Sequence, residues 1–275
     1  MSVPELPEVE IIVRGLRSLV CGRTICHAKI LDDSVLLGDP LDFAQRTCGQ
    51  RIRSVRRRGK LLILDLQGGD HLVFHLRMTG RLWVVPPGED VQQYDRLLFF
   101  LDVGVLLAFQ DQRRFGYAGV FSDQELERWP FYKNLGPEPF EMDMEAFRGI
   151  LLAPRARIKA VLLDQQRIAG IGNIYADESL FRAGVHPMTP ACMLTMQQAT
   201  CLFASLLEVL QESIAAGGSS IRDYRNAKGE KGFFQNTFAV YGRRGRPCLS
   251  CGAVLETVKV AGRTSTYCPC CQPVL

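Results

Sequence analysis

Residues 248–271 read CLSCGAVLETVKVAGRTSTYCPCC, so the pair Cys248 and Cys251 stands sixteen residues before the pair Cys268 and Cys271. Two Cys-x-x-Cys pairs can place four thiolates tetrahedrally around one metal ion, and this spacing is typical of a zinc ribbon. All four positions around the metal would be filled by protein, so we expect one structural Zn²⁺ with no catalytic role. So small a module should need the metal to fold. Cys270 lies between the last two ligands and competes with them for the metal, but the Cys-x-x-Cys spacing of Cys268 and Cys271 forms a better metal-binding turn.

The rest of the sequence is typical of a cytoplasmic protein. The first ten residues hold three glutamates and two prolines, which excludes a secretory signal. Asp102 interrupts the longest apolar run, Leu97–Phe109, so no membrane span is expected. Five scattered cysteines are interpreted as small buried hydrophobic residues: Cys21, Cys26, Cys48, Cys192 and Cys201.

The charge distribution predicts a polyanionic partner. The net charge is only +4, but residues 221–275 contain nine Lys/Arg against three Asp/Glu. A second basic run, residues 51–60, holds five arginines and Lys60 with no acid. Arginine outnumbers lysine 26 to 7, and its planar guanidinium suits phosphate. Ordinary solvated surface is the alternative interpretation of both clusters.

The first half of the chain predicts a helix followed by antiparallel strands. Apolar residues recur at helical spacing in Pro7–Val20. From there to about residue 121, short β-branched or leucine-rich runs alternate with turn residues, a pattern that favours a sandwich or flattened barrel. The clearest predicted strands are Ile25–Leu31, Leu61–Leu66, His71–Leu76, Arg81–Val85, Leu97–Asp102 and Val105–Phe109.

A linker rich in Pro, Asn and Gly, Trp129–Phe140, leads into a helical part. A break between two of its predicted helices contains Gly170-Ile-Gly-Asn173, where Asn173 starts a helix whose free N–H groups can bind a phosphate. A Gly-x-Gly alone is more often an ordinary turn, but Arg155 and Lys159 add cations just upstream. The predicted helices are Met142–Leu152, Ile158–Leu163, Ile174–Ala183 and Leu194–Ala216.

Together these features resemble the formamidopyrimidine-DNA glycosylases over essentially the whole chain. The first motif differs in the related endonuclease VIII branch, so the resemblance favours the branch that acts on oxidised purines. The matching motifs, in order, are Pro4-Glu-Leu-Pro-Glu-Val-Glu10, Arg57-Arg-Gly-Lys60, His75-Leu-Arg-Met-Thr-Gly80, Asp111-Gln-Arg-Arg-Phe-Gly116, Leu135-Gly-Pro-Glu-Pro139, Gly170-Ile-Gly-Asn-Ile-Tyr-Ala176, Gly217-Gly-Ser-Ser-Ile-Arg-Asp-Tyr224 and the cysteine finger.

The resemblance implies an α+β fold and a monomer that binds damaged double-stranded DNA. Residues 1–128 would form a catalytic N-terminal helix on an antiparallel β-sandwich. Residues 129–238 would form a helix–two-turn–helix domain carrying a lesion loop, Ser219–Glu230, and residues 239–275 a β-hairpin zinc finger. The implied activity is excision of 8-oxoguanine and formamidopyrimidines, followed by β,δ-elimination at the abasic site.

The resemblance also implies roles for individual residues. The secondary amine of an N-terminal Pro4 would attack C1′ and form an iminium, with Glu5 as acid/base and Glu8 as a supporting carboxylate. An α-amine has a pKa near 8, so more of it is neutral at pH 7 than of a lysine amine. Lys60 and Arg263 would grip phosphates during elimination. Phe115 would wedge into the duplex, Met78 fill the vacated space, and Arg113 bond the orphaned cytosine. Further DNA contacts would come from His75, Tyr94, Arg155, Lys159, Asn173 and Tyr241.

The sequence departs from the family at its start, because Met1-Ser2-Val3 precedes Pro4. We favour a translation start at Val3 encoded by GTG, with proteolytic trimming and a chain lacking the proline chemistry as alternatives. The last alternative corresponds to a lesion-binding protein without catalysis, which borohydride trapping on lesion DNA would distinguish from the enzyme. A zinc-ribbon binding protein is a third hypothesis, but it leaves residues 1–238 unexplained. Tyr94-Asp95-Arg96 stands where the family often has a DNA-contacting histidine, so the contact from Tyr94 or Arg96 is open.

Overall fold

Two facing sheets and the long helix packed against them form the core of the first of two compact units in this computed structural model, which describes residues 4–86, 88–89, 91–152, 156–220, 227 and 232–274. The first unit comprises Met1–Asn134 with Ala216–Phe233, and the second Leu135–Ala215 with Phe234–Leu275. The predicted α+β fold is confirmed. The predicted three-part division at residues 128 and 238 remains a prediction.

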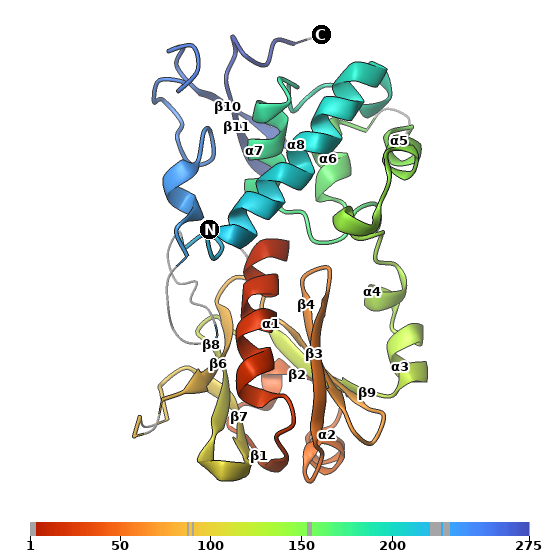
Figure 1. Cartoon of the computed structure of the whole chain (residues 1–275), viewed down its shortest axis with the longest axis vertical. Helices are drawn as coiled ribbons and strands as arrows, with labels where there is room; N and C mark the ends of the chain where they lie inside the picture. The colour runs from red at the N-terminus through yellow and green to blue at the C-terminus, as the bar shows by residue number, and fades with distance from the viewer. Residues whose placement is uncertain are drawn as a thin grey trace. The chain divides into compact units, whose positions relative to one another are not determined.

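The first unit contains a four-stranded and a five-stranded sheet (Figure 1). The four-stranded sheet has the order β1-β7-β8-β6 and is antiparallel throughout. The five-stranded sheet has the order β2-β9-β5-β4-β3, in which only the short pair β2–β9 is parallel, so the antiparallel prediction is right except at this edge. The strands are β1 (Ile25–Ile30), β2 (Leu36–Leu37), β3 (Ile52–Arg58), β4 (Leu61–Leu66), β5 (His71–His75), β6 (Gly80–Val85), β7 (Asp95–Leu101), β8 (Leu106–Asp111) and β9 (Tyr117–Phe121).

Helix α1 (Leu6–Val20) packs against both sheets of this unit through its contacts with β3 and β6 (Figure 1). Its apolar face, including Val9, Ile12 and Leu16, is buried in the same core as the inward side chains of the two sheets. Apolar burial of this kind stabilises the folded chain by roughly 25 cal/mol per Å². Three shorter helices follow the strands or connect them: α2 (Pro40–Thr47), α3 (Asp123–Arg128) and α4 (Pro130–Lys133).

The second unit is helical and ends in a β-hairpin. The predicted helices are present with boundaries shifted by a few residues, as α5 (Met144–Leu151), α6 (Ile158–Leu163), α7 (Asn173–Arg182) and α8 (Met196–Ala215). The hairpin strands β10 (Glu256–Val260) and β11 (Arg263–Tyr267) are joined by Ala261 and Gly262, whose φ values are 49° and 72°. Two positive φ angles in a two-residue loop are typical of a type I′ turn. No helix in the described ranges is long and apolar enough to cross a membrane.

The core of the first unit offers a direct stability test. Phe74 on β5 is 0% exposed, and its ring centroid lies 5.9 Å from that of Phe99 and 5.5 Å from that of Phe109. We expect Phe74→Ala to lower the free energy of unfolding by about 3–5 kcal/mol, because it leaves a cavity between the sheets. Phe100→Ala, at a ring 38% exposed, should cost about 1 kcal/mol or less. Equal losses in chemical denaturation would contradict this placement of the core.

Candidate functional site

Two buried carboxylates lie at the start of α1, directly after Pro4. Glu5 is 2% and Glu8 is 1% exposed. Glu8 Oε2 accepts a hydrogen bond from Glu5 N at 2.9 Å, while Glu8 Oε1 accepts from Ser219 N at 2.8 Å and from Ser219 Oγ at 2.9 Å. Glu8 therefore ties the helix start to the Gly217-Gly-Ser-Ser220 segment, which is more than 200 residues away in the sequence. The half-buried Pro4 stands immediately before this pair.

Lys60 lies at the same end of the unit as the α1 start. Helix α1 runs antiparallel to β3, since Gly22 N donates to Ile52 O and the Arg57 guanidinium pairs with Glu10 at 3.2 Å. The turn that follows β3 must therefore lie near the α1 N-terminus, as Figure 1 also shows. That turn is Gly59-Lys60, with glycine at φ 56° in its first central position, the type II′ pattern. The hairpin thus places Lys60 at the same end of the unit as Pro4, Glu5 and Glu8.

His75 is an uncharged, buried imidazole in β5. Burial, and after it the positive charges of Arg77 and Lys60, lower the pKa of His75 to about 3. Its Nδ1 accepts a hydrogen bond from Arg77 N at 3.0 Å, so the ring proton belongs on Nε2. Phe131 and Tyr117 pack against the ring, with centroids 5.6 Å and 5.3 Å away. Any contact with a phosphate would come from a neutral N–H donor.

Met78, Arg113 and Phe115, predicted to occupy the duplex, are neighbours in space. The Arg113 guanidinium carbon lies 4.5 Å from the Phe115 ring centroid, and Arg113 Nη1 lies 3.7 Å from Met78 Sδ. Phe115 is 50% exposed, although a phenylalanine is normally buried. Two loops that are far apart in sequence therefore bring together one cation and two apolar side chains at the surface.

Of the two residues considered for a DNA contact, Tyr94 and Arg96, only Tyr94 has an accessible side chain. The Tyr94 side chain is 37% exposed, and its carbonyl accepts a hydrogen bond from Asp111 N. The Arg96 side chain is 11% exposed, lies 3.5 Å from Asp32 and donates through Nε to Asp111 O. Arg96 thus holds β7 next to the end of β8.

Lys159 is not available to a phosphate in this structure, which corrects the expectation of a DNA contact. Its side chain is 0% exposed, and Nζ donates to Asp177 Oδ1 at 2.6 Å and to Thr264 O at 3.2 Å. Asp177 also accepts from Ser265 Oγ and from Thr266 N. This buried pair therefore joins α6 and α7 to strand β11. Burial raises the pKa of Asp177 against the opposing effect of Lys159.

Strand β11 contains Arg263 and also accepts a hydrogen bond from Asn173. Arg263 is exposed and is the first residue of β11, directly after the type I′ turn. Asn173, the first residue of α7, donates through Nδ2 to Thr264 O at 3.0 Å, and within the described residues its buried Oδ1 accepts no hydrogen bond. Gln165 holds the preceding break, because its side-chain amide donates to Ile171 O and accepts from Gly170 N. The start of α7 is thereby held against Thr264, the residue that follows Arg263 in β11.

Tyr241 is positioned by a fourth buried carboxylate, that of Glu178. Glu178 is 6% exposed and accepts three backbone hydrogen bonds, from Ala239, Val240 and Tyr241. These bonds attach the segment before the cysteine finger to α7. Arg155 lies outside the described residues, as does most of the predicted lesion loop, Ser219–Glu230.

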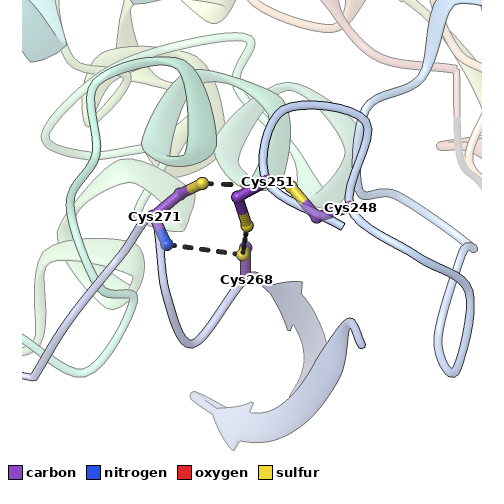
Figure 2. A group of neighbouring side chains, drawn as sticks. All are labelled: Cys248, Cys251, Cys268 and Cys271. Atoms are coloured by element: carbon purple, nitrogen blue, oxygen red, sulfur yellow. Dashed lines mark hydrogen bonds between the residues drawn. The ribbon is translucent and has the colours of Figure 1, made fainter. Parts of the chain in front are cut away.

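The four cysteines fit a tetrahedral metal site (Figure 2). Their sulfur atoms all lie within 4.8 Å of one another, with 3.9 Å between those of Cys248 and Cys271 and 3.4 Å between those of Cys251 and Cys268. Zn–S bonds of about 2.3 Å imply S–S edges of about 3.8 Å. Although burial acts to raise the pKa of Cys248, backbone N–H groups of Cys251 and Ser250 lower it to about 7, which favours a thiolate. Cys270 is exposed and is not part of the cluster.

Some positioning residues had no separate signal in the sequence. Asp177 and Glu178 follow one another on α7 and are both buried, whereas acidic residues on a helix are normally solvated. Asp111 belongs to a recognised motif, but nothing in the sequence reveals that its carboxylate is 0% exposed. The burial of an acid on a helix can be inferred from sequence when the residues around it are apolar on all faces of the helix. The sequence of α7, NIYADESLFR, has several polar residues and therefore gives no such indication.

Three family models match successive parts of the chain. The Formamidopyrimidine-DNA glycosylase N-terminal domain matches residues 3–118, and the Formamidopyrimidine-DNA glycosylase H2TH domain matches residues 135–225. A zinc finger found in FPG and IleRS matches residues 245–274. The three matches follow the order in which the motifs occur and cover most of the chain.

Curated relatives and solved structures agree with these models. A formamidopyrimidine-DNA glycosylase of Geobacillus kaustophilus is 42% identical over 277 residues, covering 98% of this chain and all of the relative, and one of Nitratidesulfovibrio vulgaris is 38% identical over 364 residues with the same coverage. A Lactococcus lactis FPG variant bound to Fapy-dG DNA is 35% identical with a TM-score of 0.92, and MutM bound to DNA containing carbocyclic 8-oxo-G is 35% identical with a TM-score of 0.91. Each structure covers 98% of this chain and is itself covered completely. The chain belongs to the formamidopyrimidine-DNA glycosylase family.

Proposed function

We propose that this protein removes oxidised purines from damaged double-stranded DNA and then nicks the abasic site, as a base-excision repair enzyme. The observation that carries the proposal is the pair of buried carboxylates, Glu5 and Glu8, directly behind Pro4. Buried ionisable groups with defined partners are typical of catalytic sites. Relatives that are alike over their full length and solved complexes with Fapy-dG and 8-oxo-G DNA support the same substrate class.

In this proposal the free amine of Pro4 attacks C1′ of the flipped nucleotide. The bond from C1′ to the base breaks, and the C1′–O4′ bond then opens while the attacking amine loses its proton. Glu5 acts as the acid/base that protonates O4′ of the sugar and assists base departure, so that an iminium links Pro4 to the ring-opened sugar. Glu8 keeps the α1 start and Ser219 in place while this occurs. Lys60 and Arg263 stabilise the phosphates that leave in the two eliminations, because cations favour the developing negative charge. Bringing C1′ to the amine requires base flipping, which costs a few kcal/mol.

The second unit would supply phosphate contacts through Arg263, Asn173 and Tyr241. Arg155 remains a proposed contact as well, and His75 and Tyr94 are proposed for the first unit. Met78, Arg113 and Phe115 would fill the space left by the flipped nucleotide. We further propose that the protein acts as a monomer in the bacterial cytoplasm; its bacterial relatives support the bacterial source.

The start of the chain decides whether the proline chemistry operates. One form should begin Met-Pro at position 4, so that methionine removal frees the Pro4 amine, and the other should keep residues 1–3. The first should excise 8-oxoguanine, cut on both sides of the abasic site and crosslink under borohydride. The second should bind DNA and crosslink poorly, because an acylated nitrogen cannot form an iminium. Mass spectrometry of both N-termini is the control. Full activity of the intact longer form would exclude Pro4 as the nucleophile.

Lys159 provides a test of the buried pair against a phosphate contact. Lys159→Met leaves Asp177 without its cation, and we expect it to destabilise the second unit by about 3–5 kcal/mol. Lys159→Met combined with Asp177→Asn should recover part of this loss and retain the salt dependence of DNA binding. Arg263→Ala should reduce the log–log salt slope by about 0.9 for each lost phosphate contact. A comparable reduction in the double variant would restore Lys159 as a DNA contact.

The cysteine cluster should bind one zinc ion per chain, and the finger should unfold without it. Cys251→Ser or chelation should displace Arg263 and abolish tight DNA binding, while the sandwich of the first unit stays folded. Cys270→Ser, one residue from a ligand, should keep its zinc and serves as the matched control. Metal analysis and DNA titration measure both effects. Reduced wild-type protein without stoichiometric zinc would refute this assignment.

A further inference from the structure

Two loops at one edge of the sandwich carry the residues proposed to enter the duplex. The plug loop, residues 76–80, joins β5 to β6 and carries Met78, while the wedge loop, residues 112–116, joins β8 to β9 and carries Arg113 and Phe115. In each loop, the residue before the apolar side chain is an arginine with positive φ: 51° for Arg77 and 57° for Arg114. Non-glycine residues seldom adopt this conformation, and it persists only where the surroundings impose it.

The carboxylate of Asp111 joins the two loops. Asp111 is the last residue of β8 and is paired with Gly80, the first residue of β6. Its Oδ1 accepts hydrogen bonds from Thr79 Oγ1, in the plug loop, and from Arg113 N at 3.1 Å, in the wedge loop. Its Oδ2 accepts from Gly116 N at 2.6 Å, so the carboxylate spans the wedge loop from beginning to end.

The loops also touch through their backbones. A Cβ atom placed on Gly116 would lie 2.9 Å from His75 O, a distance that real Cβ atoms essentially never show, and 3.1 Å from Leu76 O, which is tighter than most such contacts. Only glycine permits this approach, in which the end of the wedge loop lies on the beginning of the plug loop. His75 Nδ1 accepts from Arg77 N and so holds the positive φ of Arg77. The two loops therefore form one hydrogen-bonded body.

We propose that Asp111 and Thr79 are positioning residues that hold Met78, Arg113 and Phe115 in their inserting arrangement before DNA binds. This inference rests on the proposed roles of those three side chains. Asp111 is 0% exposed, so it acts through the loops and does not touch DNA. Arg113 N lies 3.1 Å from Asp111 Oδ1 and 3.2 Å from Thr79 Oγ1, so the same two groups that link the loops also fix the backbone of the base-reading arginine. Preorganisation of this kind reduces the entropy lost on binding.

The Thr79 hydroxyl offers a matched pair of variants. Thr79→Val keeps the shape of the side chain but removes the donor to Asp111, whereas Thr79→Ser keeps the donor. Thr47→Val is the control for stability, because Thr47 is 0% exposed and donates to Phe43 O within α2, away from both loops. Asp111→Asn is a second test. In either orientation of the new amide, its NH₂ group would face a backbone N–H, that of Arg113 or that of Gly116, so one hydrogen bond would be lost.

The first readout is hydrogen exchange of free protein, which needs no activity. Amides of residues 76–80 and 112–116 should exchange about five- to tenfold faster in Thr79→Val and Asp111→Asn than in wild type, consistent with one lost hydrogen bond. The second readout is the ratio of excision opposite cytosine to excision opposite adenine. This ratio should fall by about five- to tenfold in both variants, because Arg113 is less well placed, and remain unchanged in Thr79→Ser and Thr47→Val.

The two readouts separate the inference from the proposed function. Inactive wild type with a free Pro4 amine would refute the proposed function, while the exchange measurement would still test the loop linkage. Active wild type, with the same exchange rates and base discrimination in Thr79→Val as in Thr79→Ser, would overturn the inference. Loss of discrimination in Thr47→Val to the same degree would also overturn it, since the effect would then follow stability alone.

Discussion

A carboxylate buried away from water must receive hydrogen bonds or cations, and this constraint recurs at every part of the proposed site. Four acids satisfy it by accepting bonds from segments far away in the sequence. Glu8 accepts hydrogen bonds from Ser219, and Asp111 accepts them from both the plug loop and the wedge loop. Asp177 accepts from strand β11, and Glu178 accepts from the backbone of the segment that precedes the cysteines. Removing any one acceptor would leave backbone N–H groups buried without partners, at about 1–3 kcal/mol each.

This arrangement separates residues that do chemistry from residues that place them. The expected phosphate contact of Lys159 is an instance, since its ammonium is turned inward to Asp177 and Thr264 O. Arg263, the next residue along the chain from Thr264, stays exposed. A lysine next to the proposed phosphate-binding turn therefore stabilises the structure around that turn and does not reach the surface. Sequence proximity alone could not distinguish the two functions, because both require a positive charge at the same place.

Much of the fold could be predicted from periodicity, and the failures have physical reasons. The helix at α1 and the strands at β4 and β5 follow from apolar spacing, since each buries one face or both. Strand β3 was not among the predicted strands because its sequence, IRSVRRR, is dominated by arginines. Two of those arginines are paired across the structure, Arg56 with Asp65 and Arg57 with Glu10. The spacing of the cysteines was enough to predict the metal cluster. The proximity of Met78 and Arg113 could not be predicted from their separation in sequence, because it depends on the pairing of β6 with β8.

The first unit is made from two separated stretches of chain, and this has a consequence for its biosynthesis. Residues 216–233 complete a unit whose other part ends at Asn134, and all helices of the second unit from α5 to α8 are translated in between. Ala227 is 0% exposed in the core of the first unit, and its carbonyl accepts a hydrogen bond from Val84 N. A nascent chain that has emerged only as far as residue 215 therefore holds Pro4 and Glu5 but lacks Ser219, the partner of Glu8. The ribosome must therefore deliver the helices of the second unit before the first unit can close, so a prematurely terminated chain would carry the proposed nucleophile without a finished site around it.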